Sequence, residues 1–237
     1  MSTVRRFQSV LSADNISVCG RSVNILILYI NQNMQTKFNL PEKEYKILKT
    51  LNTPAKVQDF LNKMPFNFEP GGDTSMSPLM VLQKGTCHCA EGAVLAALAL
   101  RVHGYEPLLL DLTANKIDFD HVVALFKKNG KWGAVSKTNH AVLRYREPIY
   151  NTVCELAMSY FHEYFDNSGR KNLRSFSGPV NLKRFDKCGW MTTLEETSYI
   201  PEYLAEVKHF PILTRKQIAG LRRAESIEIE AGKIVEW

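Results

Sequence analysis

The chain has 237 residues, of which 45% are hydrophobic, 23% charged and 10% aromatic. These are values of a globular protein of one or two domains, and they exclude a wholly disordered chain, a coiled coil and a collagen. The net charge is +6 and the 30 Lys and Arg residues are scattered, so no nucleic-acid partner is expected. Five cysteines form no disulfide framework of a secreted protein, which favours a reducing, cytoplasmic location.

Residues 1–40 are predicted to be a variable N-terminal extension that ends near Leu40-Pro41. Its apolar stretch, residues 23–30, is interrupted by Asn24 and is too short to cross a bilayer. No small-residue cleavage site follows it, so we expect a strand or short helix there and no membrane partner. Residues 41–237 are predicted to form a single domain with a C-terminal elaboration.

Helices are predicted in the first half of this domain. Residues 42–51 look helical, and Thr53-Pro54 is typical of an N-cap followed by the first helical residue. Residues 90–102 are rich in Ala and Leu and are apolar on nearly all sides, which predicts a buried helix. Gly104 is expected to end that helix in a left-handed conformation.

An antiparallel hairpin is predicted after this helix. Residues 107–112 form a short apolar run, and residues 121–126 and 132–136 are two more apolar runs separated by Asn129-Gly130. Asn-Gly between apolar runs is the strongest short-range signal of a hairpin. The order of helix, strand and hairpin predicts an α+β fold in which a helix packs on an antiparallel sheet.

The last third of the chain is expected to add helices and one strand pair. Residues 147–165 contain a plausible amphipathic helix after Pro148, and residues 214–224 look like an exposed helix. Residues 227–237 are expected to form a strand pair around Ala231-Gly232.

Cys89 lies directly before the predicted buried helix. The free N–H groups of the first helical turn and the helix dipole stabilise a thiolate there, and the thiolate is the nucleophilic form. His121 opens a strand some thirty residues later. A Cys before a helix and a His at a strand start are suited to acyl transfer.

The length of the hairpin loop decides which residue lies beside His121. With a two-residue loop, Val123 faces Ser136 and His121 faces Thr138, so these four side chains share one face of the sheet. Ser136 or Thr138 then fixes the tautomer of the imidazole. An odd loop would bring Asn139 opposite His121 instead.

The central motifs are Cys89-Ala-Glu-Gly-Ala93, Leu98-Ala-Leu-Arg101-Val-His-Gly104, Asp120-His121-Val-Val and Asn129-Gly-Lys-Trp-Gly-Ala-Val-Ser136. Together they resemble the transglutaminase-like superfamily of papain-like cysteine enzymes. That family has an Ala four residues after the Cys, an Arg near the helix end and a Gly that closes the helix. This register selects Cys89 rather than Cys87. The resemblance covers about a quarter of the chain.

The resemblance implies a papain-like or transglutaminase-like core and a cysteine hydrolase or acyltransferase, of protease, amidase or transglutaminase type. Cys89 would attack the amide or ester bond of a peptide, protein or small amide, with His121 as the base. No cofactor or metal is implied, although some members of the superfamily require calcium. Gln83, six residues before Cys89, has the spacing of a glutamine that completes the oxyanion hole in papain-like proteases.

The chain departs from the family at one position. The third catalytic residue is usually Asp, four residues after the Trp, and Ser136 stands there. A serine orients an imidazole but cannot stabilise an imidazolium by charge. Ser136 is the predicted third residue, with Asn139 or Asp120 as alternatives.

Two other functions stay open. A binding or scaffolding module that kept the fold and lost catalysis would accommodate Ser136. A redox or metal module would use Cys87, His88 and Cys89, but structural zinc usually takes two spaced pairs of ligands and the other cysteines are isolated. We therefore expect no metal site.

Overall fold

The structure, a computed structural model, describes residues 37–235. The predicted strand or helix at residues 23–30 lies outside the described residues, as does most of the predicted extension. Phe38 and Leu40, at the end of that extension, are buried in the hydrophobic core. The core therefore includes the last residues of the predicted extension.

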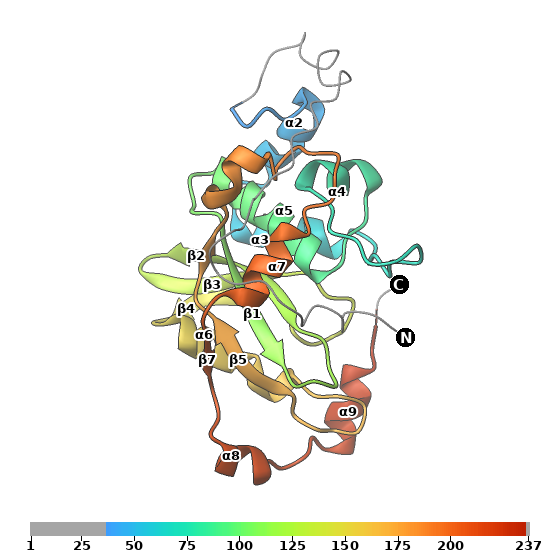
Figure 1. Cartoon of the computed structure of the whole chain (residues 1–237), viewed down its shortest axis with the longest axis vertical. Coiled ribbons are helices and arrows are strands. Elements are labelled where there is room, and N and C mark those ends of the chain that lie inside the picture. The colour runs from blue at the N-terminus through green and yellow to red at the C-terminus, as the bar shows by residue number, and fades with distance from the viewer. Residues whose placement is uncertain (1–36, 236–237) are drawn as a thin grey trace.

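In the described part of the chain, helices α2 to α5 come first, strands β1 to β4 follow, and the remaining helices and strands come after them (Figure 1). The helices that the structure describes, with 3-10 helices written as η, are α2 (Glu42–Thr50), α3 (Pro54–Asn62), α4 (Pro78–Lys84), α5 (Cys89–Val102), α6 (Val153–Ser159), η1 (Phe161–Glu163), η2 (Leu182–Cys188), α7 (Tyr199–Glu206), α8 (Arg215–Ala219) and α9 (Ser226–Gly232). The strands are β1 (Leu108–Ala114), β2 (His121–Lys128), β3 (Lys131–Ser136), β4 (Arg146–Tyr150), β5 (Leu173–Ser177), β6 (Val180–Asn181) and β7 (His209–Pro211).

The strands form an antiparallel sheet in the order β4-β3-β2-β1-β5-β7, with β6 paired to β1 beside that path. The β2–β3 hairpin has the predicted register, in which Val123 pairs with Ser136. Asn129 and Gly130 have φ values of 50° and 77°, as a type I′ turn requires. The two-residue loop is therefore confirmed, and it brings the end of β3 beside His121.

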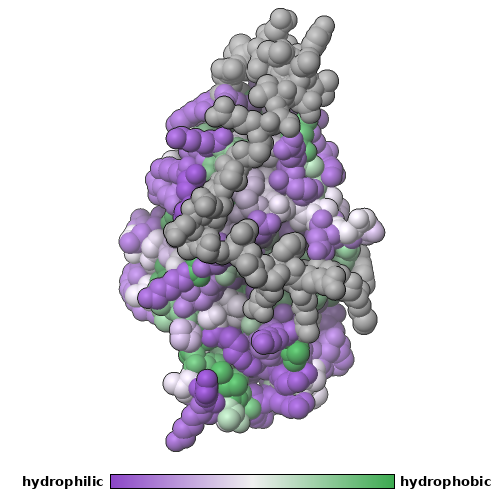
Figure 2. Space-filling view, in the orientation of Figure 1, coloured by the Kyte–Doolittle hydropathy of each residue, from purple (hydrophilic) through white to green (hydrophobic). Residues whose placement is uncertain are grey.

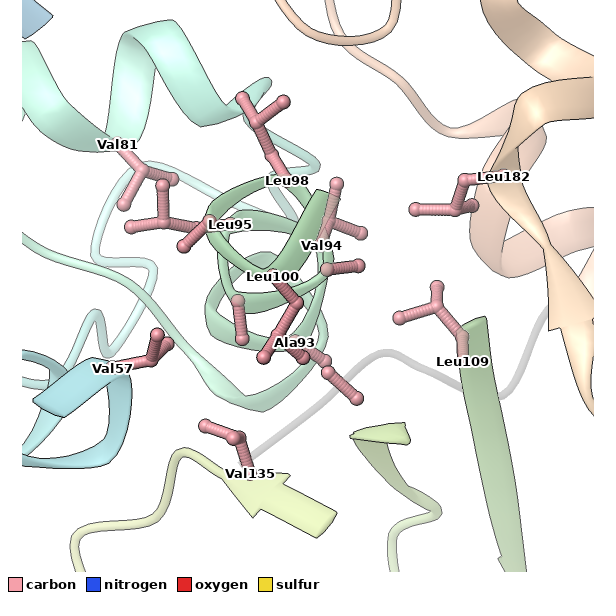
Figure 3. Close-up of a cluster of buried hydrophobic side chains, with 14 of the residues drawn as sticks. Val57, Val81, Ala93, Val94, Leu95, Leu98, Leu100, Leu109, Val135 and Leu182 are labelled. Carbon is pink, nitrogen blue, oxygen red and sulfur yellow. The ribbon is translucent and has the colours of Figure 1, made fainter. Parts of the chain in front are cut away.

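Helix α5 is the centre of the core on one face of the sheet. Its residues 91–100 are all buried, as the Ala- and Leu-rich sequence predicts, and Gly104 follows it with a φ of +89°. Side chains of α5 point outward on several sides, toward neighbouring helices and strands (Figure 3). The neighbours labelled there are Val57 of α3, Val81 of α4, Leu109 of β1, Val135 of β3 and Leu182 of η2.

The opposite face of the sheet is covered by α6 and η1. Val123, Leu125 and Ala134 of the hairpin pack there with Leu156 of α6 and Phe161 of η1. The α+β class and the helix packed on an antiparallel sheet are thus confirmed. Helices α2 to α4 and α7 to α9 are the helical N- and C-terminal elaborations.

The predicted helix over residues 147–165 begins later than expected. Pro148 lies in β4, which is an edge strand of the sheet, where a missing backbone N–H costs no ladder hydrogen bond. Helix α6 starts only after Thr152, whose side chain accepts a hydrogen bond from the Glu155 N–H. The N-cap residue, and not the proline, marks the helix start.

The predicted strand pair over residues 227–237 is wrong for the described part of that segment. Residues 226–232 form α9, whose N-terminus has a capping box made by Glu225 and Glu228. The predicted helix over residues 214–224 is also shorter, because α8 ends at Ala219.

One face of the molecule is mostly polar where it is described. Hydrophilic residues cover much of the face shown in Figure 2, and a small hydrophobic cluster lies toward its lower end, where Figure 1 places α8. No helix within residues 37–235 has the length and apolar character that a bilayer span requires.

Candidate active site

Cys89 is the first residue of α5, and the residue before it, His88, is the N-cap. The Nδ1 atom of His88 accepts a hydrogen bond from the Ala90 N–H at 3.2 Å, and Glu91 accepts one from the His88 N–H at 3.0 Å. This reciprocal capping box fixes the start of the helix, so that the partly exposed Cys89 thiol stands at the positive end of the helix dipole.

Two imidazoles, those of His121 and His88, determine the electrostatics of the Cys89 thiol. Burial alone raises the pKa of this thiol, but hydrogen bonds with His121 and His88, together with the charge on each ring, outweigh burial and lower the pKa from 9.0 to about 5. The thiolate is therefore the main form of Cys89 at neutral pH. A depressed thiol pKa at a partly exposed site is the usual property of a nucleophilic cysteine.

The protonation of the His121 ring follows from its second contact. Its Nε2 atom lies 2.7 Å from Ser136 Oγ. The single proton of that hydroxyl is donated to the Leu143 carbonyl at 2.5 Å, so the Ser136 oxygen must accept from His121. Nε2 therefore carries the proton, and Nδ1 is left with the lone pair that can take the thiol proton.

Gln58 holds Ser136 in this position, and no motif in the sequence points to this role. Its side-chain Oε1 accepts from the Ser136 N–H at 2.9 Å, and its Nε2 donates to the Ser136 carbonyl at 2.7 Å. Gln58 lies on α3 and is buried. The two bonds engage the backbone of Ser136, the last residue of β3, and they fix the direction of its side chain.

Cys87 has the opposite environment. It is fully buried in the core, and burial raises the pKa of its thiol to about 12 despite the charge of Lys137. A Cβ at Gly92 of α5 would meet its sulfur at 3.3 Å. Cys87 is thus packed beneath α5 as a neutral thiol, while Cys89 faces the histidines.

Two other residues that the sequence analysis considered, Asp120 and Asn139, have different surroundings. Asp120 turns to β1, where its Oδ1 accepts from the Ala114 N–H at 2.7 Å, and burial and the charge of Asp111 raise its pKa to about 6. Asn139 is buried and lines a small pocket with Lys137, while Ser136 occupies Nε2 of His121.

Gln83 lies in the last turn of α4 and is exposed. Its contribution to an oxyanion hole stays a prediction. Within residues 37–235, no group of three or more His, Cys, Asp and Glu side chains is arranged to hold a metal ion.

Ser136→Ala is expected to lower the rate of acylation at Cys89 by about tenfold, because one neutral hydrogen bond that selects the tautomer is lost. Single-turnover kinetics with an activated ester measure this rate. Asn139→Ala is the matched control and should change the rate little. The reverse order of effects would assign the orienting role to Asn139.

Comparisons with known proteins give no family. No family model matches the chain, and no curated protein matches it. Among solved structures, LapG from Legionella pneumophila is similar at 18% identity and a TM-score of 0.33, over 47% of this chain and 70% of that chain. Its calcium-bound form gives 17% and 0.34 over the same shares, and its EGTA-treated form gives 18% and 0.32 over 47% and 68%. Similarities at this level assign neither family nor function.

Proposed function

We propose that the protein is a cysteine hydrolase or acyltransferase that attacks amide or ester bonds through Cys89 and His121. The observation that carries this proposal is the thiol at the start of α5, whose pKa is lowered to about 5 beside an imidazole of fixed tautomer. A cysteine kept only for packing has no need of either feature. Cys87, two residues earlier, has neither.

The proposed reaction uses these groups in order. His121 Nδ1 takes the proton of the Cys89 thiol, and the sulfur attacks the carbonyl carbon of the substrate. The backbone N–H of Cys89, with Gln83 as a proposed second donor, stabilises the oxyanion. The tetrahedral intermediate then expels the amine or alcohol, which receives the proton from His121 and leaves an acyl-enzyme.

Transfer of the acyl group from Cys89 to an acceptor completes the catalytic cycle. Water gives hydrolysis, as in a protease or amidase, and an amine gives transfer, as in a transglutaminase. We propose a peptide, a protein or a small amide as the substrate. The predicted cytoplasmic location and the expected lack of nucleic-acid and membrane partners remain predictions.

The alternative is a catalytically inactive scaffolding module, and Ser136 in place of a carboxylate is the observation that favours it. Ser136 selects the tautomer of His121 but adds no negative charge to stabilise its imidazolium form. An enzyme with this site must obtain its charge stabilisation elsewhere. The two functions therefore differ in whether Cys89 forms an acyl-enzyme.

Incubation with p-nitrophenyl acetate tests the proposal. We expect a burst of p-nitrophenolate, a gain of one acetyl group in the intact mass, and peptide mapping that places the group on Cys89. Because the thiolate forms as the pH rises through about 5, the burst rate should rise through that pH and then level off. An unmodified protein over the whole pH range would favour the inactive module.

A further inference from the structure

The second imidazole at the thiol, that of His88, lies in a ring of acceptors. Its Nε2 atom is 3.0 Å from the Thr74 carbonyl oxygen, 3.5 Å from Glu91 Oε1 and 3.6 Å from Glu69 Oε1. Since all three neighbours accept hydrogen bonds and none donates, Nε2 carries a proton. The other nitrogen, Nδ1, lies on the side of the helix start.

The two carboxylates favour a positive charge on this ring. Glu91 is only 2% exposed, and its oxygens accept from the Thr74 hydroxyl at 2.8 Å and from the Met76 N–H at 3.0 Å. A buried carboxylate is costly unless a cation lies near it, and His88 is the ion-pair partner of both Glu91 and Glu69.

We propose that the imidazolium of His88, held by Glu69 and Glu91 at the start of α5, stabilises by its positive charge the thiolate of Cys89, the next residue in the chain. The proposal rests on the proposed function of the same site. The positive charge of His88 acts on the Cys89 thiolate, whereas the negative charge that Ser136 lacks would act on the imidazolium of His121.

The cap of α5 and the protonation of His88 are coupled. A neutral ring accepts the Ala90 N–H at Nδ1, as the 3.2 Å distance shows. A protonated ring has no lone pair there, so protonation of His88 gives up this cap. An anion at Cys89 favours a cation on the neighbouring ring, so ionisation of Cys89 favours protonation of His88.

Electrostatics support this coupling. Burial lowers the pKa of His88, but the hydrogen bond and charge of Cys89, the charge of Glu91 and the Thr74 carbonyl outweigh burial and raise the pKa to about 9. Between about pH 5 and pH 9 the thiolate of Cys89 and the imidazolium of His88 therefore coexist.

The test is the pH dependence of alkylation of Cys89 by iodoacetamide, followed by mass spectrometry. In His88→Asn, the side-chain oxygen still caps α5 while the charge is lost. We expect the midpoint of the rate profile to rise, with labelling at the wild-type midpoint slower by about tenfold. Glu69→Gln keeps the shape of Glu69 and removes one carboxylate, so its midpoint should lie between those of the wild type and His88→Asn.

Alkylation at pH 9 is the internal control, because the thiolate is then formed in every variant and the rates should converge if the fold is intact. A His88→Asn midpoint equal to that of the wild type would overturn the role of His88. Alkylation of Cys89 needs no catalytic turnover. The role of His88 can therefore be refuted without refuting the proposed enzymatic function, and the reverse also holds. A wild-type protein that alkylates at low pH but forms no acyl-enzyme would refute the proposed function alone.

Discussion

Replacing Cys89 by Ala is expected to abolish both acyl-enzyme formation and labelling by a thiol-reactive probe at pH 6. At this pH the thiolate of Cys89 is the main form, because its pKa is about 5. Thiolate and not thiol reacts with such probes. Intact mass measured after a short exposure to iodoacetamide gives the result directly, and the wild type should gain one label before any other cysteine reacts.

Cys87→Ala is the matched control, two residues away. Its thiol is fully buried and has a pKa of about 12, so it contributes no thiolate at pH 6. The substitution removes one buried sulfur and should lower the free energy of unfolding by about 1 kcal/mol, without loss of labelling. A Cys87→Ala protein that no longer labels, beside a Cys89→Ala protein that does, would show that the nucleophile has been assigned to the wrong cysteine.

The parts of the fold that were predicted correctly depend on local chemistry. Thr53 caps α3 and Pro54 opens it, because a side-chain oxygen and a missing N–H suit those two positions. Asn129 and Gly130 adopt the positive φ values of a type I′ turn. Each of these signals lies within four residues of the feature it predicts.

The predicted strand pair over residues 227–237 is wrong for a physical reason. Ile227-Glu-Ile-Glu230 alternates apolar and polar residues, which is the period of a strand. Within residues 37–235 these four residues pair with no strand. The segment forms α9 instead, where Glu225 and Glu228 cap the helix and Gly232 lies against Phe165. Tertiary context overrides a four-residue pattern of this kind.

The candidate site also contains some residues that local sequence signals predict and others that only tertiary packing brings together. The positions of Cys89 at a helix start and of Ser136 beside His121 follow from one helix boundary and one hairpin register. Gln58 lies 78 residues from Ser136, and only the packing of α3 against the sheet brings the two together. The carboxylate of Glu69, in the loop before α4, reaches His88 in the same way.

His121→Ala is expected to slow acyl transfer from an amide substrate by about two to four orders of magnitude. The Nδ1 atom is lost both as the acceptor of the thiol proton and as the donor to the leaving amine. The p-nitrophenolate of an activated ester leaves without a proton, so acylation by the ester should fall by a smaller factor. Single-turnover rates with the amide and with the ester, measured on the same preparation, separate these two contributions.

Thermal unfolding provides the control for this variant, because His121 is largely buried at the start of β2 and its removal leaves a small cavity. Cys89 in His121→Ala keeps its contact with His88, so part of its alkylation by iodoacetamide should survive. The combined His88→Asn, His121→Ala variant should then lose most of the alkylation of Cys89 that remains at pH 6 in His121→Ala. A folded His121→Ala protein that transfers acyl groups at the wild-type rate with both substrates would remove His121 from the mechanism.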